Sequence, residues 1–222
     1  MTLESNKTLG GVGAILILVG SIVTTYTFGV LTLIGVILVF IALNGLANYY
    51  KERGIFTNAI YSLVAGIVGV VVAASAALYI VFDTTILKNL LLNIYPTWNG
   101  SWSTLSSLRG MTPNTSNISM SDVTSALGAI FLVLVILWVF AIVAAFFARR
   151  SLKTLSSKAS VGLFSTAALL LIIGSVLTII FIGAIIIWIA VLLIAIAFFQ
   201  IKPQPEQPPA TMAPPPSTPT PV

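Results

Sequence analysis

The chain lacks cysteine and histidine entirely, and charged residues make up only 7% of its 222 residues. Without cysteine there are no disulfides, thiol nucleophiles or thiolate zinc ligands, and without histidine there is no imidazole acid–base catalysis or haem ligation. An ordinary soluble domain is about 25% charged. These absences argue against most enzyme and metalloprotein classes and against a surface that faces water.

Hydrophobic residues make up 58% of the chain, and the mean hydropathy is +1.11. The net charge is +5, which raises the question of nucleic acid. Basic residues of such an apolar chain gather at membrane rims, where they set orientation, and no basic module interleaved with aromatics is present. The composition predicts an integral membrane protein that does not bind nucleic acid.

Three long apolar runs end in the same way, with an aromatic pair followed by positive charge, at 48–53, 145–150 and 197–202. Aromatic rings favour the headgroup level of a bilayer, and Lys and Arg accumulate on its cytoplasmic side. Each ending is therefore interpreted as a helix that leaves the membrane into the cytoplasm. The predicted anchors at this inner interface are Tyr49, Tyr50, Lys51, Arg53, Phe146, Phe147, Arg149, Arg150, Phe198, Phe199 and Lys202.

A membrane-spanning helix needs about 20 apolar residues, so the longest runs must be divided. The last run, Val161 to Gln200, has no strongly polar turn, and its weakest point is Thr178–Gly183, where we expect a tight reversal. The sequence predicts six spans near residues 9–25, 29–50, 56–82, 123–148, 161–179 and 182–200.

The Lys and Arg residues set the orientation. With both termini in the cytoplasm, the outer segments hold only Lys88 and Arg109, and the other eight of the ten basic residues lie inside. This bias follows the positive-inside rule. The predicted fold is all-α, a polytopic bundle of three helical hairpins with both termini cytoplasmic, in the cell (plasma) membrane.

Two segments are not predicted to span. The outer loop, 83–122, begins with apolar residues at helical spacing from Ile86 to Ile94, which indicates a short helix on the outer membrane face or an extension of the third span. The segment after the membrane domain (1–201) is a cytoplasmic tail, 202–222, with nine prolines between Pro203 and Val222. That composition predicts a disordered, extended, polyproline-II-rich segment.

Three N-glycosylation acceptors lie in the outer loop, at Asn99, Asn114 and Asn117. The motif is short and arises by chance, but all three copies fall in the one long segment that is predicted to lie outside. A fourth match, at Asn6, is predicted to face the cytoplasm and to remain unmodified.

Small residues recur at every fourth position of the third span: Ala65, Gly69, Ala73 and Ala77. Such a strip lets a second helix pack closely, either within the bundle or in a second copy of the chain. Near the inner end of the second span, Asn44 and Asn48 lie one helical turn apart. They hydrogen-bond a neighbouring helix or line a polar vestibule.

No charged residue lies within the six predicted spans. Proton relays and ion-coupled transporters place ionisable groups there, so we predict no catalytic, metal or cofactor site and no enzyme activity. The leading hypothesis is a non-enzymatic membrane interaction or scaffold protein. The alternative is a channel or facilitator for a small neutral or weakly polar solute. The expected partners are the lipid bilayer and either other membrane proteins or further copies of the chain.

The segments 5–13, 46–51 and 54–59 carry a family resemblance. They resemble an uncharacterised, mostly archaeal integral membrane family, domain of unknown function 996, most closely over residues 4–70 and further to about residue 201. The resemblance implies an archaeal cell membrane. It implies no activity and no functional residues.

Overall fold

The computed structural model describes residues 2–23, 29–82, 85–116 and 118–203, and every regular element in these ranges is a helix. Six helices are long and apolar enough to cross a membrane, which confirms the predicted all-α bundle. The proline-rich tail beyond residue 203 lies outside the described residues. The six are α1 (Leu3–Ile22), α3 (Val30–Tyr49), α4 (Arg53–Phe82), α6 (Met120–Ala159), α7 (Gly162–Leu177) with the 3-10 turn η2 (Thr178–Ile180), and α8 (Ile182–Phe199).

Two helices begin at side-chain caps. Thr2 accepts a hydrogen bond from Ser5 N at 3.3 Å, so α1 begins six residues before the apolar run at residue 9. Ser119 accepts one from Asp122 N at 3.1 Å and begins α6. Each cap satisfies a backbone N–H that the first turn of a helix leaves unpaired.

Helix α6 is much longer than the apolar run from which it was predicted. It has 40 residues, about 60 Å of helix, and it ends at Ala159 instead of near Ala148. The extra turns place Leu152 and Leu155 in the protein core, so they are held by packing and not by lipid. Ser160, in the left-handed conformation with φ 54°, ends the helix.

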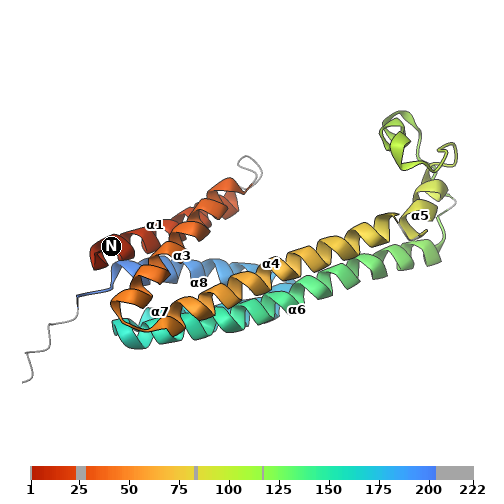
Figure 1. The fold of residues 1–222 in the computed structure, drawn as a ribbon. Coiled ribbons are helices and arrows are strands. Elements are labelled where there is room, and N and C mark those ends of the chain that lie inside the picture. The colour runs from red at the N-terminus through yellow and green to blue at the C-terminus, as the bar shows by residue number, and fades with distance from the viewer. Residues whose placement is uncertain (1, 24–28, 83–84, 117, 204–222) are drawn as a thin grey trace, which may run out of the picture.

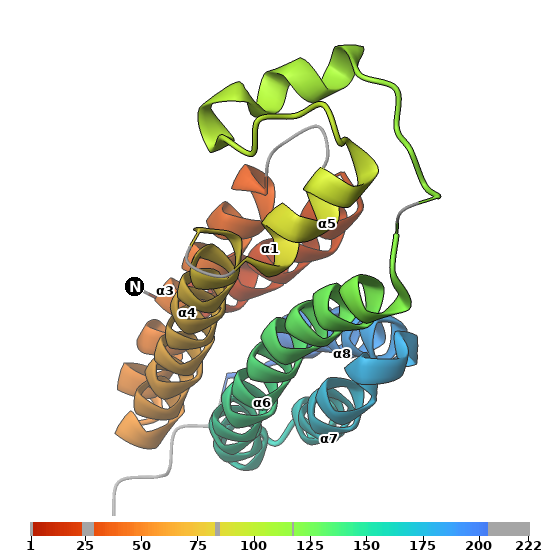
Figure 2. The ribbon, with the colours of Figure 1, turned by 90° about the vertical axis from the view of Figure 1, so that its right-hand side faces the viewer.

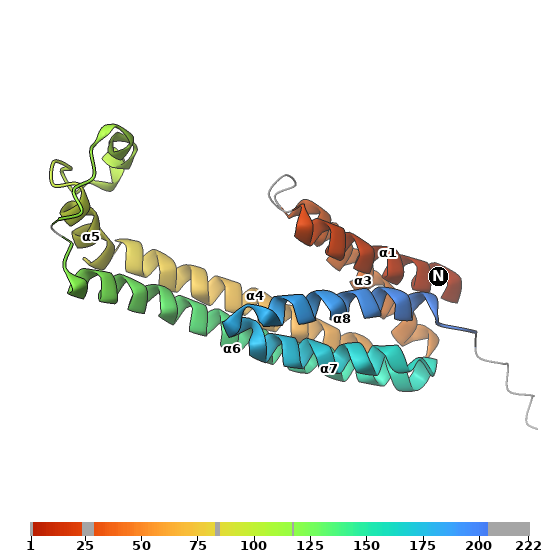
Figure 3. The same ribbon diagram turned by 180° about the vertical axis from the view of Figure 1, so that it is seen from behind.

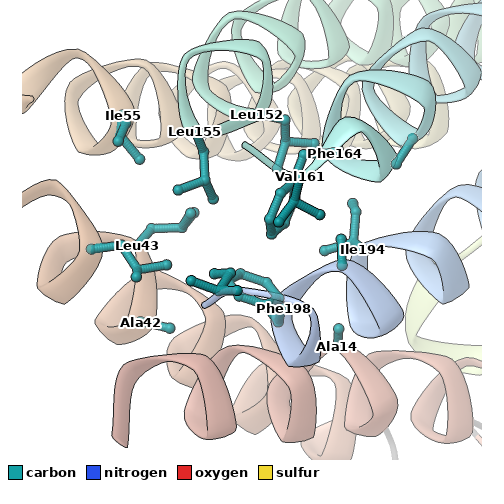
Figure 4. Packing of buried hydrophobic residues seen from close by; sticks show 14 of the residues in the cluster. Ala14, Ala42, Leu43, Ile55, Leu152, Leu155, Val161, Phe164, Ile194 and Phe198 are labelled. Atoms are coloured by element: carbon teal, nitrogen blue, oxygen red, sulfur yellow. The ribbon is translucent and has the colours of Figure 1, made fainter. Parts of the chain in front are cut away.

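The six helices pack as a closed ring at one end of the molecule, in the order α1, α3, α4, α6, α7, α8 and back to α1 (Figures 1 and 3). We call this the basic end, because Lys51, Arg53, Arg149 and Arg150 lie there. The main hydrophobic core lies inside the ring, where side chains from different helices point toward one another (Figure 4). Its largest fully buried apolar side chains are Phe164, Phe198, Leu46, Ile55, Leu155 and Ile201.

Two contacts give the lengthwise alignment of the helices. At the basic end Ser151 Oγ donates to Ile55 O at 2.6 Å, which joins α6 to α4. Farther along α6, Trp138 Nε1 donates to Val176 O at 3.1 Å, near the end of α7. The last turn of α7 therefore lies level with Trp138, and the residues of α6 before it, 120–137, extend about 27 Å beyond that level.

We call the part beyond that turn the distal half. It consists of residues 70–82 of α4, residues 120–137 of α6 and the segment between them, and Figure 3 shows this pair of helices continuing past α7 and α8. Figure 2 views the molecule from this end. No residue of α6 before Ser151 is buried, whereas Ser151, Leu152 and Leu155 are.

Candidate functional site

The segment 86–116, which we call the distal cap, closes the far end of the α4–α6 pair. It contains α5 (Ile86–Ile94) and the 3-10 helix η1 (Trp102–Gly110), so the predicted short helix is present. Asn93 Nδ2 donates to Asp122 Oδ2 at 2.7 Å, and Ser119 Oγ donates to the same oxygen at 2.6 Å. The bond from Asn93 ties α5 to the first turn of α6.

Aromatic rings hold the distal cap onto the end of α4. Trp102 lies edge-to-face with both Phe82 and Trp98, each at a centroid separation of 5.9 Å. Trp98 is 3% exposed, and its indole N–H donates to Thr104 Oγ1 at 3.1 Å. The cap is thus a packed element, and its tryptophans present apolar rings together with a satisfied polar edge.

Beneath α5 lies an apolar cavity of about 300 Å³. Its walls come from α4, α5 and α6, and they include Ala77, Ile86, Leu87, Ala126 and Ala129. Small side chains on α4 and α6 leave this space between the two helices.

Two of the predicted glycosylation acceptors lie on the exposed surface of the distal cap. Asn99 Oδ1 accepts from Ser101 N at 3.0 Å and from Thr104 Oγ1 at 2.7 Å. Asn114 Oδ1 accepts from Ser116 N at 3.0 Å. In both, the amide oxygen is held by the local turn while the side chain remains exposed.

The other two acceptor motifs differ from these. Asn117 lies outside the described residues. Asn6 is 1% exposed, and a methyl group at Gly45 of α3 would overlap its amide, so its side chain is inaccessible. Its Oδ1 has no hydrogen-bond partner within the described part of the chain.

The small-residue strip of α4 faces α6. Gly69 and Ala73 are buried, Ala65 and Ala77 are half-buried, and a Cβ at Gly69 would overlap the side chain of Phe140. The strip is therefore covered by α6 of the same chain.

The predicted anchors at the basic end divide into two groups. Tyr49, Phe146 and Phe199 are exposed, and Arg150 lies 4.5 Å from the ring centroid of Phe146.

The second group differs from the prediction. Phe198 is fully buried, against Gly10 and edge-to-face with Phe164 at 5.2 Å, and Tyr50 is buried as well. These two rings stabilise the core and do not reach the lipid. An aromatic pair on a helix places its members on different faces, so one ring packs inward when the other faces out.

Two cavities open at the basic end. One, of about 510 Å³, is lined by Asn44 and Asn48 together with Ile41, Gly45 and Tyr49. The larger, of about 1130 Å³, lies where α1, the α6–α7 turn and the end of α8 meet. The polar and basic side chains that line it are Lys7, Ser160, Thr166, Gln200 and Lys202.

Two lysines at the basic end form ion pairs with glutamates. Lys7 Nζ lies 2.8 Å from Glu4 Oε1, and Lys158 Nζ lies 3.2 Å from Glu52 Oε2. Within the described ranges, no group of three or more His, Cys, Asp or Glu residues could hold a metal ion. The cavities at this end are thus lined by basic side chains together with amides and hydroxyls.

Comparison with known proteins gives a family and no activity. The sequence profile of the family described as "Protein of unknown function (DUF996)" matches residues 31–192. The uncharacterized protein MJ1644 of Methanocaldococcus jannaschii is 25% identical over 201 residues, which cover 90% of this chain and 94% of the relative. No solved structure matches. The fold of six apolar helices and the match over most of the chain confirm the resemblance, and the chain belongs to the DUF996 family of multi-pass membrane proteins.

Proposed function

We propose that this protein is a non-enzymatic scaffold of the cell membrane, which presents the distal cap on one side and the basic end with its tail on the other. The observation that carries the proposal is the filled centre of the helix ring. Phe164, Phe198 and Leu155 are fully buried there, together with other large apolar side chains. A solute path along the ring axis needs room and hydration, so this packing supports the scaffold.

The hydroxyl groups that a facilitator would use are directed onto their own helices. Ser21 Oγ donates to Leu18 O at 2.7 Å, and Ser175 Oγ donates to Ile172 O at 2.8 Å. Thr24, at the end of the first predicted span, lies outside the described residues. Ser175 is buried and Ser21 is exposed, and hydroxyls that are already paired with their own helix favour helix packing over solute contact.

The facilitator remains the second candidate because Asn44 and Asn48 line a cavity at the basic end. Purified protein in lipid vesicles separates the two functions. A scaffold gives the same rate of stopped-flow swelling as empty vesicles with water, glycerol and urea. It also retains a partner at fixed stoichiometry during purification in mild detergent. Swelling that is faster than in empty vesicles, and that Asn44→Leu abolishes, would favour the facilitator.

The scaffold proposal also assigns the surface through which the outer partner binds. On η1 of the distal cap, Trp102 is half-buried and Leu105 is exposed among polar side chains, whereas Lys202 begins the segment on the opposite side. A partner of the outer side is lost in Trp102→Ala and kept after removal of residues 204–222. A partner of the inner side shows the reverse. A partner that both variants retain would contradict the assignment.

We further propose that Asn99 and Asn114 carry N-linked glycans in a host with that pathway, with Asn117 as a competing neighbour of Asn114. A glycan is bulky and solubilising, and it would screen the distal cap at the cell surface. Intact-mass measurement should show a mass increase that Asn99→Gln and Asn114→Gln each reduce. Asn6→Gln is the matched control and should change nothing. An increase that only Asn6→Gln removes would reverse the proposed orientation.

A further inference from the structure

The lengthwise offset between the helices conflicts with six complete crossings. The uncharged stretch of α6, Val123 to Ala148, has 26 residues and is about 39 Å long, whereas the hydrocarbon core of a bilayer is about 30 Å thick. This stretch includes the distal half of α6, where Leu127 is 60% exposed and Phe131 is 58% exposed. Such side chains need an apolar surrounding, so the bilayer has to cover the distal half.

That placement sets the depth of the α7–α8 turn. Arg149 and Arg150 mark the boundary of the hydrocarbon on the basic side, because charge at the bilayer centre is costly. From Arg149 to Trp138, which is level with the last turn of α7, α6 rises by only about 16 Å. The turn thus reaches about the middle of the bilayer and stops.

The chemistry of the turn fits an apolar surrounding. Phe181 is 85% exposed, the highest exposed fraction among the large apolar residues of the described chain, and Ile180 and Ile182 beside it are also exposed. The only hydroxyl of the turn, on Thr178, donates to Gly174 O at 2.7 Å. A turn that met water at the far membrane surface would expose this apolar cluster to it.

The backbone of the turn is largely paired within the protein, as a hydrocarbon surrounding requires. Phe181 N donates to Thr178 O at 3.0 Å, and Ala184 N donates to Phe181 O at 3.1 Å. From α6, the indole of Trp138 donates to Val176 O, a carbonyl in the last turn of α7. At the other end of the hairpin, Phe164 and Phe198 are covered by the protein core and do not need lipid.

We infer that the α7–α8 hairpin is re-entrant: it enters the membrane from the basic side, turns near the middle with its apolar tip in lipid hydrocarbon, and returns. The α4–α6 pair crosses the whole bilayer, and its distal half contacts the lipid of the far leaflet. Both chain termini stay on one side in this arrangement, as they do with six crossings. The inference does not depend on the scaffold function.

Single cysteines test the inference directly, because the chain has none of its own. In sealed vesicles, a membrane-impermeant maleimide should label Ser106→Cys on the distal cap from one side and Ser157→Cys at the basic end from the other. It should label Phe181→Cys from neither side until the membrane is dissolved in denaturing detergent. Labelling of Phe181→Cys from the same side and at the same rate as Ser106→Cys would overturn the re-entrant hairpin.

Nitroxide depth measurements provide a second, independent test. A spin label at Phe181→Cys should collide with oxygen far more than with a water-soluble nickel chelate, which places it near the bilayer centre. A label at Leu127→Cys should lie shallower but still within hydrocarbon. Both native side chains are exposed, so neither substitution disturbs the core. Chelate access at Leu127→Cys equal to that at Ser106→Cys would place the distal half in water and overturn the inference.

Discussion

The basic end and the distal half both contain long apolar helices, but the two parts differ in how the apolar side chains of these helices are buried. At the basic end six helices surround a core in which Phe164 and Phe198 are completely covered by protein. In the distal half α4 and α6 run as a pair, and none of the α6 side chains there is buried. The comparison shows that hydrophobicity alone does not distinguish a protein core from a lipid-facing surface.

The difference follows from what surrounds a side chain in each part of the molecule. A side chain in the packed ring loses its close contacts when it is truncated, because the surrounding helices relax only partly. A side chain in contact with lipid is as well solvated by acyl chains after truncation as before. The two halves should therefore respond very differently to matched substitutions.

Truncation of a core phenylalanine should give the largest effect. Phe164→Ala should lower the free energy of unfolding by about 3–5 kcal/mol, because it leaves a cavity against Phe198. Phe131→Ala in the distal half is the matched control, at a site that is 58% exposed, and should change the free energy little. Unfolding followed by circular dichroism in mixed micelles measures both. An equal cost at the two sites would mean that protein, not lipid, covers the distal half.

A substitution that pushes α1 and α3 apart should give the next largest effect. A Cβ at Gly35 would lie 2.6 Å from Gly13 O and 2.8 Å from Ile17 N, so Gly35→Ala should separate the helices at a cost of about 1–3 kcal/mol.

Gly66→Ala on α4 is the matched control for that substitution, because nothing lies within 4 Å of its Cβ position. There alanine should be neutral or stabilise the helix by up to about 1 kcal/mol. The same unfolding measurement compares the two. A neutral Gly35→Ala would show that α1 is not packed against α3 as described.

These contrasts also indicate what the sequence could and could not predict. The aromatic and basic endings and the length of the apolar runs are local properties, and they were enough for six helices and for the reversal near Thr178. The continuation of α6 to Ala159 depends on Leu152 and Leu155 packing against other helices. Their spacing of three residues was a weak signal among the serines and lysines of that segment.

The filled ring, the cavity below α5 and the lengthwise offset of the α7–α8 hairpin were beyond sequence reasoning. Each depends on which residues of distant segments lie at the same level, as Trp138 and Val176 do. A pattern along one helix shows which residues share a face, but it does not show how far a neighbouring helix slides along it. The buried positions of Tyr50 and Phe198 were missed for the same reason.

Loss of the bond between α5 and α6 should have a smaller and local effect. Asn93→Ala removes the 2.7 Å hydrogen bond to Asp122, and it should destabilise the distal cap by about 1 kcal/mol. Hydrogen exchange of the α5 amides should become about fivefold faster, while the basic end is unchanged. Asn89→Ala, on the exposed side of α5, should leave exchange as it is. Faster exchange at both ends would indicate that the two halves unfold together.

The smallest effect should come from the ion pair that joins the α3–α4 turn to the end of α6. Glu52 and Lys158 are 3.2 Å apart with side chains 36% and 43% exposed, and an exposed pair contributes only about 0.2–1 kcal/mol. The double-mutant cycle Glu52→Gln, Lys158→Met and both together isolates this coupling from the other contacts of each residue. The coupling should weaken as salt rises, because ions screen exposed charges. A coupling well above 1 kcal/mol that salt does not change would mean that the pair is shielded from water. The basic end would then lie deeper in the membrane than the position of Arg149 and Arg150 indicates.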